Sequence, residues 1–161
     1  MKTNACRILD ALHIPYTTRE YAVDPDDLTG QTVARKIGLP EAQVFKTLLC
    51  RIDTTELVFA VLSVAQELDF KKLAVAAGGH KAKLASLSEV QPLTGYIRGG
   101  VTVFGGKKDF PVFADRSIEI FDIISVSAGT RGLQILLAPA DYLRAANATV
   151  VDLATHAGDA P

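Results

Sequence analysis

Lys46 is the first residue in this sequence whose surroundings could support chemistry. It lies in an apolar, β-prone run from 45 to 52, and alternate residues of a strand face opposite sides. Lys46 therefore shares the more apolar face with Leu48, Cys50 and Ile52. An ammonium turned toward an apolar interior loses hydration, so it needs an anionic or hydrogen-bonding partner, or its pKa must fall. Either outcome suits a ligand site; the alternative is that the side chain extends past the apolar edge to water.

A glycine-rich segment, GYIRGGVTVFGG at 95–106, is the second candidate, with five glycines in twelve residues. Clustered glycines let backbone N–H groups converge on an anion. The spacing excludes a phosphate loop, which needs G-x-x-x-x-G-K-[ST], because Gly105 is followed by Gly106. The remaining chemical interpretation is a loop whose amides approach an ester or carbonyl oxygen. The structural alternative is a set of bulges and turns in a curved sheet.

A third segment, SVSAGTRG at 125–132, lies between two predicted strands and places Ser127 where it could contact a ligand. No G-x-S-x-G elbow surrounds this serine, so it is not expected to be a nucleophile. Neither a Ser/His/Asp set nor a Cys/His set stands out, and the two cysteines and three histidines have no zinc-ligand spacing. We therefore expect no metal and no cofactor.

The elements that must position these segments follow from periodicity and turn signals. We expect helices near 5–12, 29–38, 69–76 and 139–146 and strands near 16–23, 45–52, 57–63, 111–115, 118–126, 132–137 and 149–152. Segment 95–106 is expected to be strand interrupted by tight turns. The pattern predicts one domain over 1–161 of α/β (α+β) class, with a mixed, mostly antiparallel sheet or open barrel flanked by helices. A doubly wound parallel sheet fits less well, because few strands are joined by helical crossovers.

Charge along the chain is uneven although the 161 residues carry a net charge of only −1. Residues 1–70 carry −3, residues 71–108 carry +6 and residues 109–161 carry −4. A basic middle segment indicates a polyanionic partner, and the alternative is a solvated face balanced by acidic neighbours. With 48% hydrophobic residues the chain is not a disordered protein. No apolar run is long enough to span a membrane, so we expect no membrane partner and a cytoplasmic protein.

Four motifs in order along the chain resemble the YbaK/EbsC family, which is related to the editing insertion domain of bacterial prolyl-tRNA synthetase. They are VFKTLL at 44–49, GYIRGGV at 95–101, SAGTRGLQ at 127–134 and LAPAD at 137–141. The resemblance runs from Tyr21 to about Val151. It implies a trans-editing aminoacyl-tRNA deacylase that removes cysteine, or alanine in relatives, from mischarged tRNA(Pro). Editing is needed because an active site built for proline poorly rejects amino acids of similar or smaller size.

The resemblance also implies roles for individual residues. Lys46 would contact the terminal adenosine or the ester, and the amides of Gly99 and Gly100 would hold the ester carbonyl. Further substrate-binding candidates are Tyr21, Thr29, Gly30, Ile97, Thr102, Ser127, Gly129 and Gln134. In the cysteine-specific branch the thiol of the substrate attacks its own ester, so either a hydrolase or a lyase route is implied and no protein nucleophile is required. Gln134 stands where some cysteine-deacylating members carry an aspartate, which leaves the amino acid open.

Two function classes follow. The favoured one is a deacylase with misacylated tRNA(Pro) as substrate and prolyl-tRNA synthetase as a further candidate partner. The alternative is a non-catalytic tRNA-binding or regulatory module on the same fold. Retention of Lys46 and both loop glycines favours the enzyme.

Overall fold

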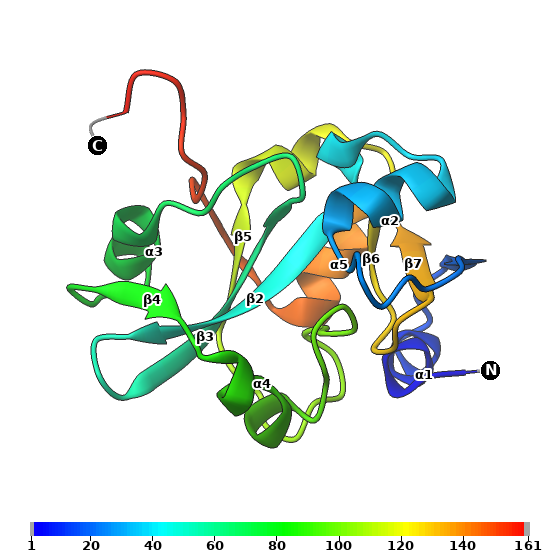
Figure 1. Ribbon diagram of the computed structural model, residues 1–161, viewed down its shortest axis with the longest axis horizontal. Helices are drawn as coiled ribbons and strands as arrows, with labels where there is room; N and C mark the ends of the chain where they lie inside the picture. Colours follow the sequence, from blue (N-terminus) through cyan, green and yellow to red (C-terminus); the bar gives the residue numbers. More distant parts are fainter. Residues whose placement is uncertain (1, 160–161) are drawn as a thin grey trace.

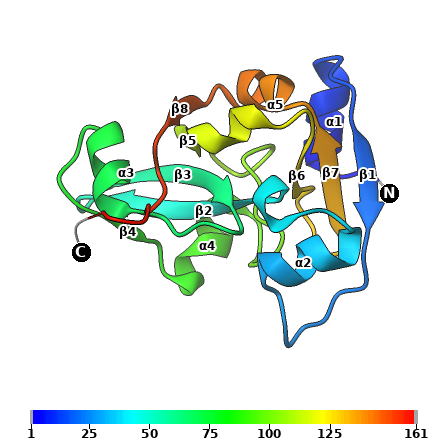
Figure 2. The ribbon, with the colours of Figure 1, turned by 90° about the horizontal axis from the view of Figure 1, so that it is seen from above.

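The computed structural model describes residues 2–159, which form two β-sheets (Figures 1 and 2). The five-stranded sheet has the order β4 (Ala82–Leu84), β2 (Phe45–Ile52), β3 (Glu56–Ser63), β5 (Val112–Asp115), β8 (Thr149–Val151). The three-stranded sheet has the order β1 (Thr17–Glu20), β7 (Leu133–Leu137), β6 (Ile124–Ser127). Strand pairs are antiparallel except β3 with β5 and β5 with β8, so the predicted mixed, mostly antiparallel α/β fold is confirmed.

Five α-helices of the described residues surround these sheets. They are α1 (Asn4–Ala11), α2 (Gly30–Ile37), α3 (Phe70–Ala76), α4 (Leu87–Thr94) and α5 (Pro139–Ala146). At the starts of α1, α2 and α3 a side chain accepts backbone N–H groups that the helix leaves unpaired. Thr29 accepts from Thr32 N in this way, and Asp69 accepts from the N–H groups of Lys71 and Lys72. Helix α2 ends at Gly38, whose φ of +75° is the left-handed conformation that glycine adopts without a steric cost.

The hairpin of β2 and β3 is the centre of the fold. Phe45 pairs with Ser63 and Ile52 with Glu56, so every residue of both strands is in register. One face of β2 carries Phe45 and Leu49 into the larger core, and the other carries Cys50 and Ile52 into a smaller core under α3. In Figure 2 the two sheets lie side by side, with α2 and α4 on the same side of β2. A parallel bridge between Val44 and Ser125 joins the sheets.

Two local predictions were wrong, and two elements were not predicted. Residues 118–126, expected as one strand, form a short 3-10 helix (Arg116–Ile120) and then β6. Segment 95–106 contains no strand, because three of its glycines, Gly95, Gly99 and Gly105, have positive φ. Strand β4 and helix α4 were missed. Helix α4 has little apolar periodicity and contains Pro92, and a capping box of Ser86 with Glu89 starts it.

The hydroxyl of Tyr142 is buried in the larger core near the side chain of Thr47, but no hydrogen bond of good geometry reaches it among residues 2–159. A buried hydroxyl without a partner costs free energy, so Tyr142→Phe is expected to raise the free energy of unfolding by about 1 kcal/mol. The matched control is Tyr96→Phe, because the Tyr96 hydroxyl donates to Phe104 O at 2.5 Å. That change is expected to lower stability by about 1 kcal/mol. Urea unfolding of both variants measures the two changes in stability. Equal losses of stability in Tyr142→Phe and Tyr96→Phe would contradict the difference between the two hydroxyls.

Candidate functional site

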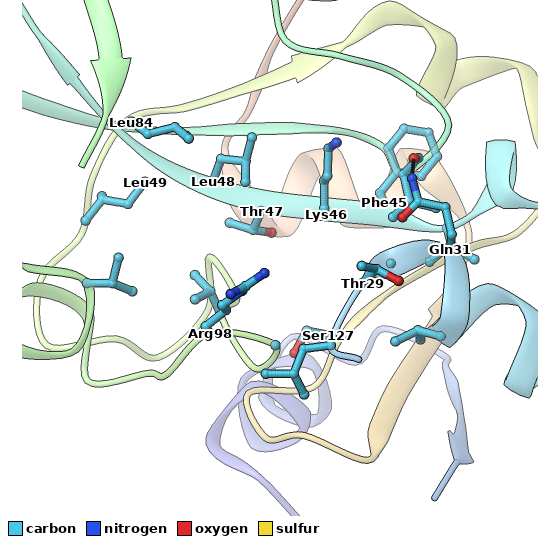
Figure 3. Close-up of a pocket in the computed structure, with 18 of the residues that line it drawn as sticks. Thr29, Gln31, Phe45, Lys46, Thr47, Leu48, Leu49, Leu84, Arg98 and Ser127 are labelled. Carbon is cyan, nitrogen blue, oxygen red and sulfur yellow. Dashed lines mark hydrogen bonds between the residues drawn. The ribbon is translucent and has the colours of Figure 1, made fainter. Parts of the chain in front are cut away.

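A pocket of about 580 Å³ lies between β2, the start of α2, helix α4 and the glycine-rich segment (Figure 3). Its walls are mainly aliphatic, with a few polar groups spaced around them, as in most small-molecule sites. The polar side chains of the lining are those of Thr29, Gln31, Lys46, Thr47, Arg98, Ser127 and Gln134. Leu84 and Leu87 line the α4 side and remain 51% and 66% exposed, so this side of the pocket is an apolar rim open to solvent.

The open edge of β2 forms one wall. Strand β4 pairs with β2 only at residues 50–52, and Ala85 N donates to Leu49 O next to them. Backbone groups along a strand alternate in direction, so those of Thr47 point the same way as those of Leu49, away from β3. The N–H and C=O of Thr47 therefore face the pocket and have no backbone partner within the described chain. They are one donor and one acceptor available to a ligand.

Lys46 lies on this wall with its side chain half-buried. Its ammonium donates to Gln66 O at 2.9 Å, on the side away from Arg98 (Figure 3). An ammonium has three donors, so two remain for a ligand. Burial lowers the pKa of Lys46, and the charge of Glu67 raises it in part. The prediction that Lys46 is turned toward an apolar surrounding and needs a hydrogen-bonding partner agrees with this geometry.

Glu67→Gln tests this electrostatic balance. Removing the acidic charge leaves burial as the main influence, so the pKa of Lys46 is expected to fall further below its usual value. An NMR titration of the Lys46 side chain measures the shift, with Glu119→Gln at an exposed position of the 3-10 helix as control. An unchanged titration in Glu67→Gln would show that Glu67 does not influence the pKa of Lys46.

The glycine-rich segment forms the opposite wall through Arg98, Gly99 and Val101. The Nε of Arg131 donates to Arg98 O at 2.8 Å, which fixes the backbone of this wall. Gly99 has φ +88°, a conformation that a side chain would strain. Gly100 lies behind the wall, where an added Cβ would be 3.2 Å from the backbone of Thr130. Segments 95–106 and 125–132 therefore pack backbone against backbone.

The start of α2 closes the pocket at the end nearest Lys46. Gly30 packs against Val64, and an added Cβ at Gly30 would lie 2.1 Å from Val64 Cγ1. Gln31 Nε2 donates to Val64 O at 2.8 Å, and Thr29 Oγ1 donates to Asp27 Oδ1 at 2.8 Å. The absence of a side chain at Gly30 lets the helix end approach β3 closely enough to form this wall.

The pocket brings together six of the eleven residues singled out from the sequence: Lys46, Gly99, Thr29, Gly30, Ser127 and Gln134. Gln134 is 5% exposed and accepts a hydrogen bond from Ser125 Oγ at 2.8 Å. The other five lie outside the lining. Tyr21 packs with the small cluster under α2, Ile97 is exposed, and Gly100, Thr102 and Gly129 lie behind the glycine wall. The N–H of Gly100 already donates to Ile97 O at 2.9 Å.

Three polar pocket residues were missed by the sequence reasoning: Gln31, Thr47 and Arg98. Each is a direct neighbour of a residue that was chosen, so the motifs located the segments but not the side chains that face inward. For Thr47 an available signal was its position in the VFKTLL motif. For Arg98 the available signal was a basic residue inside the glycine-rich segment, between the candidates Ile97 and Gly99.

The charge of the pocket is positive. Its lining contains Lys46 and Arg98 but no aspartate or glutamate within the described residues. Within the +6 segment Lys72 is paired with acidic side chains, Asp152 at 3.2 Å and Asp159 at 3.1 Å. Of the charged side chains of this segment, Arg98 is the one that lines the pocket in the described part of the chain. Among residues 2–159 no helix is long and apolar enough to cross a membrane.

Residues 24–145 match the family described as aminoacyl-tRNA editing domain. An Enterococcus faecalis protein named "Putative Cys-tRNA(Pro)/Cys-tRNA(Cys) deacylase EbsC" is 40% identical over 154 residues, which are 96% of this chain and 94% of that protein. The Escherichia coli K12 "Multifunctional Ser/Thr-tRNA deacylase ProXp-y" is 33% identical over 126 residues, 76% of this chain and 75% of that one.

A solved structure described as that of "a putative trans-editing enzyme for prolyl tRNA synthetase" has the same fold. The TM-score is 0.79 at 23% identity, and the match covers 97% of this chain and 99% of the other. At this identity the likeness concerns the fold.

Proposed function

Because the chain belongs to the aminoacyl-tRNA editing domain family, in the YbaK/EbsC group, we propose that it is a trans-editing aminoacyl-tRNA deacylase. The substrate would be tRNA(Pro) carrying a small wrong amino acid, cysteine first, with alanine as the second candidate. The observation that carries this proposal is the pocket between β2 and the glycine wall. It combines Lys46, Arg98 and the free backbone edge of Thr47 and contains no acidic side chain among its lining residues.

The terminal adenosine and its ester match the pocket in chemical character. The aliphatic lining and the rim formed by Leu84 and Leu87 suit a nucleobase face. The two donors left on Lys46 and the amides of Thr47 and Gly99 suit an ester carbonyl or a ribose hydroxyl. Gly100 supports this arrangement indirectly, since its lack of a side chain lets the glycine wall pack on Thr130.

Deacylation in this pocket needs no protein nucleophile. With a cysteinyl ester, the substrate thiolate attacks the ester carbonyl carbon, the bond to the ribose oxygen breaks, and that oxygen takes a proton. The product is a thiolactone. With an alanyl, seryl or threonyl ester, water attacks the same carbon and the free amino acid leaves. In both routes the protein positions the ester and stabilises charge that develops on its carbonyl oxygen.

A panel of charged tRNAs tests the proposal. Purified protein is mixed with tRNA(Pro) carrying cysteine, alanine, serine, threonine or proline, and loss of the ester is followed with time. We expect rapid loss of cysteine and no loss of proline. Addition of prolyl-tRNA synthetase tests whether a partner improves selection of the tRNA. Tight binding of tRNA without loss of any ester would favour the non-catalytic tRNA-binding module instead.

A further inference from the structure

The guanidinium of Arg98 is a cation without a partner at the pocket wall. Within residues 2–159 it makes no hydrogen bond and no ion pair, whereas the backbone carbonyl of the same residue accepts a hydrogen bond from Arg131 Nε. Arg51 and Arg144, by contrast, are paired with Glu89 and Asp141. Arg98 is exposed and lines the pocket, so its unpaired guanidinium is available to a ligand that enters there.

The direction of the side chain supports this. In Figure 3 the guanidinium projects from the glycine wall into the space between Thr47 and Ser127, whereas Lys46 points the other way, toward Gln66. The two cations of the lining therefore serve different parts of the pocket. Because Arg131 holds the carbonyl of Arg98 at 2.8 Å, the base of the side chain is fixed before any ligand arrives. Such fixation reduces the entropy cost of binding.

We propose that Arg98 forms an anion subsite for the 5′-phosphate of the terminal nucleotide, while the Lys46 end of the pocket takes the ester. This inference rests on the proposed function, which supplies a ligand that ends in a nucleoside ester preceded by one phosphodiester. A guanidinium offers a planar pair of N–H donors that matches two phosphate oxygens, which a lysine ammonium does not. Among residues 2–159 no carboxylate lines the pocket and competes for it.

The role assigned to Arg98 is binding, not chemistry. The phosphate does not change its charge when the ester is cleaved, so the contact has equal strength in the ground state and in the transition state. Loss of the contact is therefore expected to raise KM and leave kcat nearly unchanged. This separates Arg98 from a residue that acts on the ester carbonyl, whose loss lowers kcat.

The test compares two small probes that differ only by the phosphate. Adenosine and adenosine 5′-(methyl phosphate), a diester with one negative charge, are titrated by calorimetry into the wild type, Arg98→Ala, Arg98→Lys and Lys81→Ala. Lys81 is the matched control, because it belongs to the same basic segment but does not line the pocket. We expect the wild type and Lys81→Ala to bind the phosphate-bearing probe about tenfold more tightly. Arg98→Ala should bind both equally, and Arg98→Lys should fall between.

Aminoacylated forms of the same two probes provide the kinetic arm. Wild-type protein is expected to show a KM about tenfold lower for the phosphate-bearing ester, and Arg98→Ala is expected to lose that difference with an unchanged kcat. Equal affinity of the wild type for both calorimetric probes, or binding of neither, overturns the subsite. Phosphate-dependent binding without cleavage of either ester would retain the subsite and overturn the deacylase function, so the two failures are distinguishable.

Discussion

Replacing Lys46 by alanine is expected to lower kcat/KM for deacylation by at least about 100-fold while the protein stays folded. The reason is that Lys46 lines the pocket and its ammonium, which donates to Gln66 O, retains two free donors for the ester. Removal of one well-placed donor to a developing oxyanion costs about 100- to 1,000-fold in kcat. Time courses with cysteinyl-tRNA(Pro), together with circular dichroism of the variant, measure both parts of this expectation.

Lys46→Met separates the role of the ammonium from that of the aliphatic stem. Methionine keeps an unbranched stem against the aliphatic lining but removes the ammonium. Because burial lowers the pKa of Lys46, the charged form of the lysine is less favourable in the folded state than in the unfolded state. Below its folded-state pKa the lysine therefore costs stability, and this cost disappears as pH rises toward its usual pKa.

The expected outcome for Lys46→Met is a protein that is inactive and at neutral pH at least as stable as the wild type. The stability difference should shrink when urea unfolding is repeated at higher pH. Lys83→Met on β4 is the matched control, since Lys83 is exposed and lies outside the pocket lining. Full deacylation by Lys46→Met would remove the ammonium from the mechanism. A large loss of stability would mean that Lys46 serves the fold.

How far the fold could be predicted depended on the kind of signal each element carries. Helix α2 was predicted well because Gly38 and Pro40 mark its end, and the β2–β3 hairpin because two apolar runs flank a polar turn. Helix α4 was missed because its stability depends on its caps and contacts more than on an apolar stripe. Strand β4 has three residues, too few for alternation to be seen.

The site was partly predictable for a related reason. Alternation along β2 singled out Lys46, and the glycine-rich segment was found from composition alone. The open edge at Thr47 could not be predicted, because it exists only where β4 stops pairing with β2, and that depends on the path of residues 79–86 in space. Likewise, the sequence places Ile97, Arg98 and Gly99 together, but only the folded backbone shows that Arg98 and Gly99 line the pocket.

Gly30→Ala is expected to lower the free energy of unfolding by about 1–3 kcal/mol, the usual cost of overpacking a well-filled site. Helix propensity alone predicts the opposite sign, since alanine is favoured over glycine by up to about 1 kcal/mol in helices. The steric effect should dominate, because the added Cβ would lie 2.1 Å from Val64 Cγ1 and 2.7 Å from Val64 Cβ. Neither atom lies at the end of a flexible side chain, so the start of α2 must move away from β3.

That movement should also affect the pocket, because Thr29, Gly30 and Gln31 form its end wall and Gln31 is tied to Val64 O. A higher KM for deacylation is therefore expected alongside the stability loss. The double variant Gly30→Ala, Val64→Ala removes the 2.1 Å approach to Val64 Cγ1 and leaves the 2.7 Å approach to Val64 Cβ. Its loss of stability should therefore be smaller than the sum of the losses of the two single variants. Urea unfolding of the four proteins measures this coupling. Stabilisation by Gly30→Ala alone, or strict additivity, would show that α2 does not depend on the close approach of Gly30 to Val64.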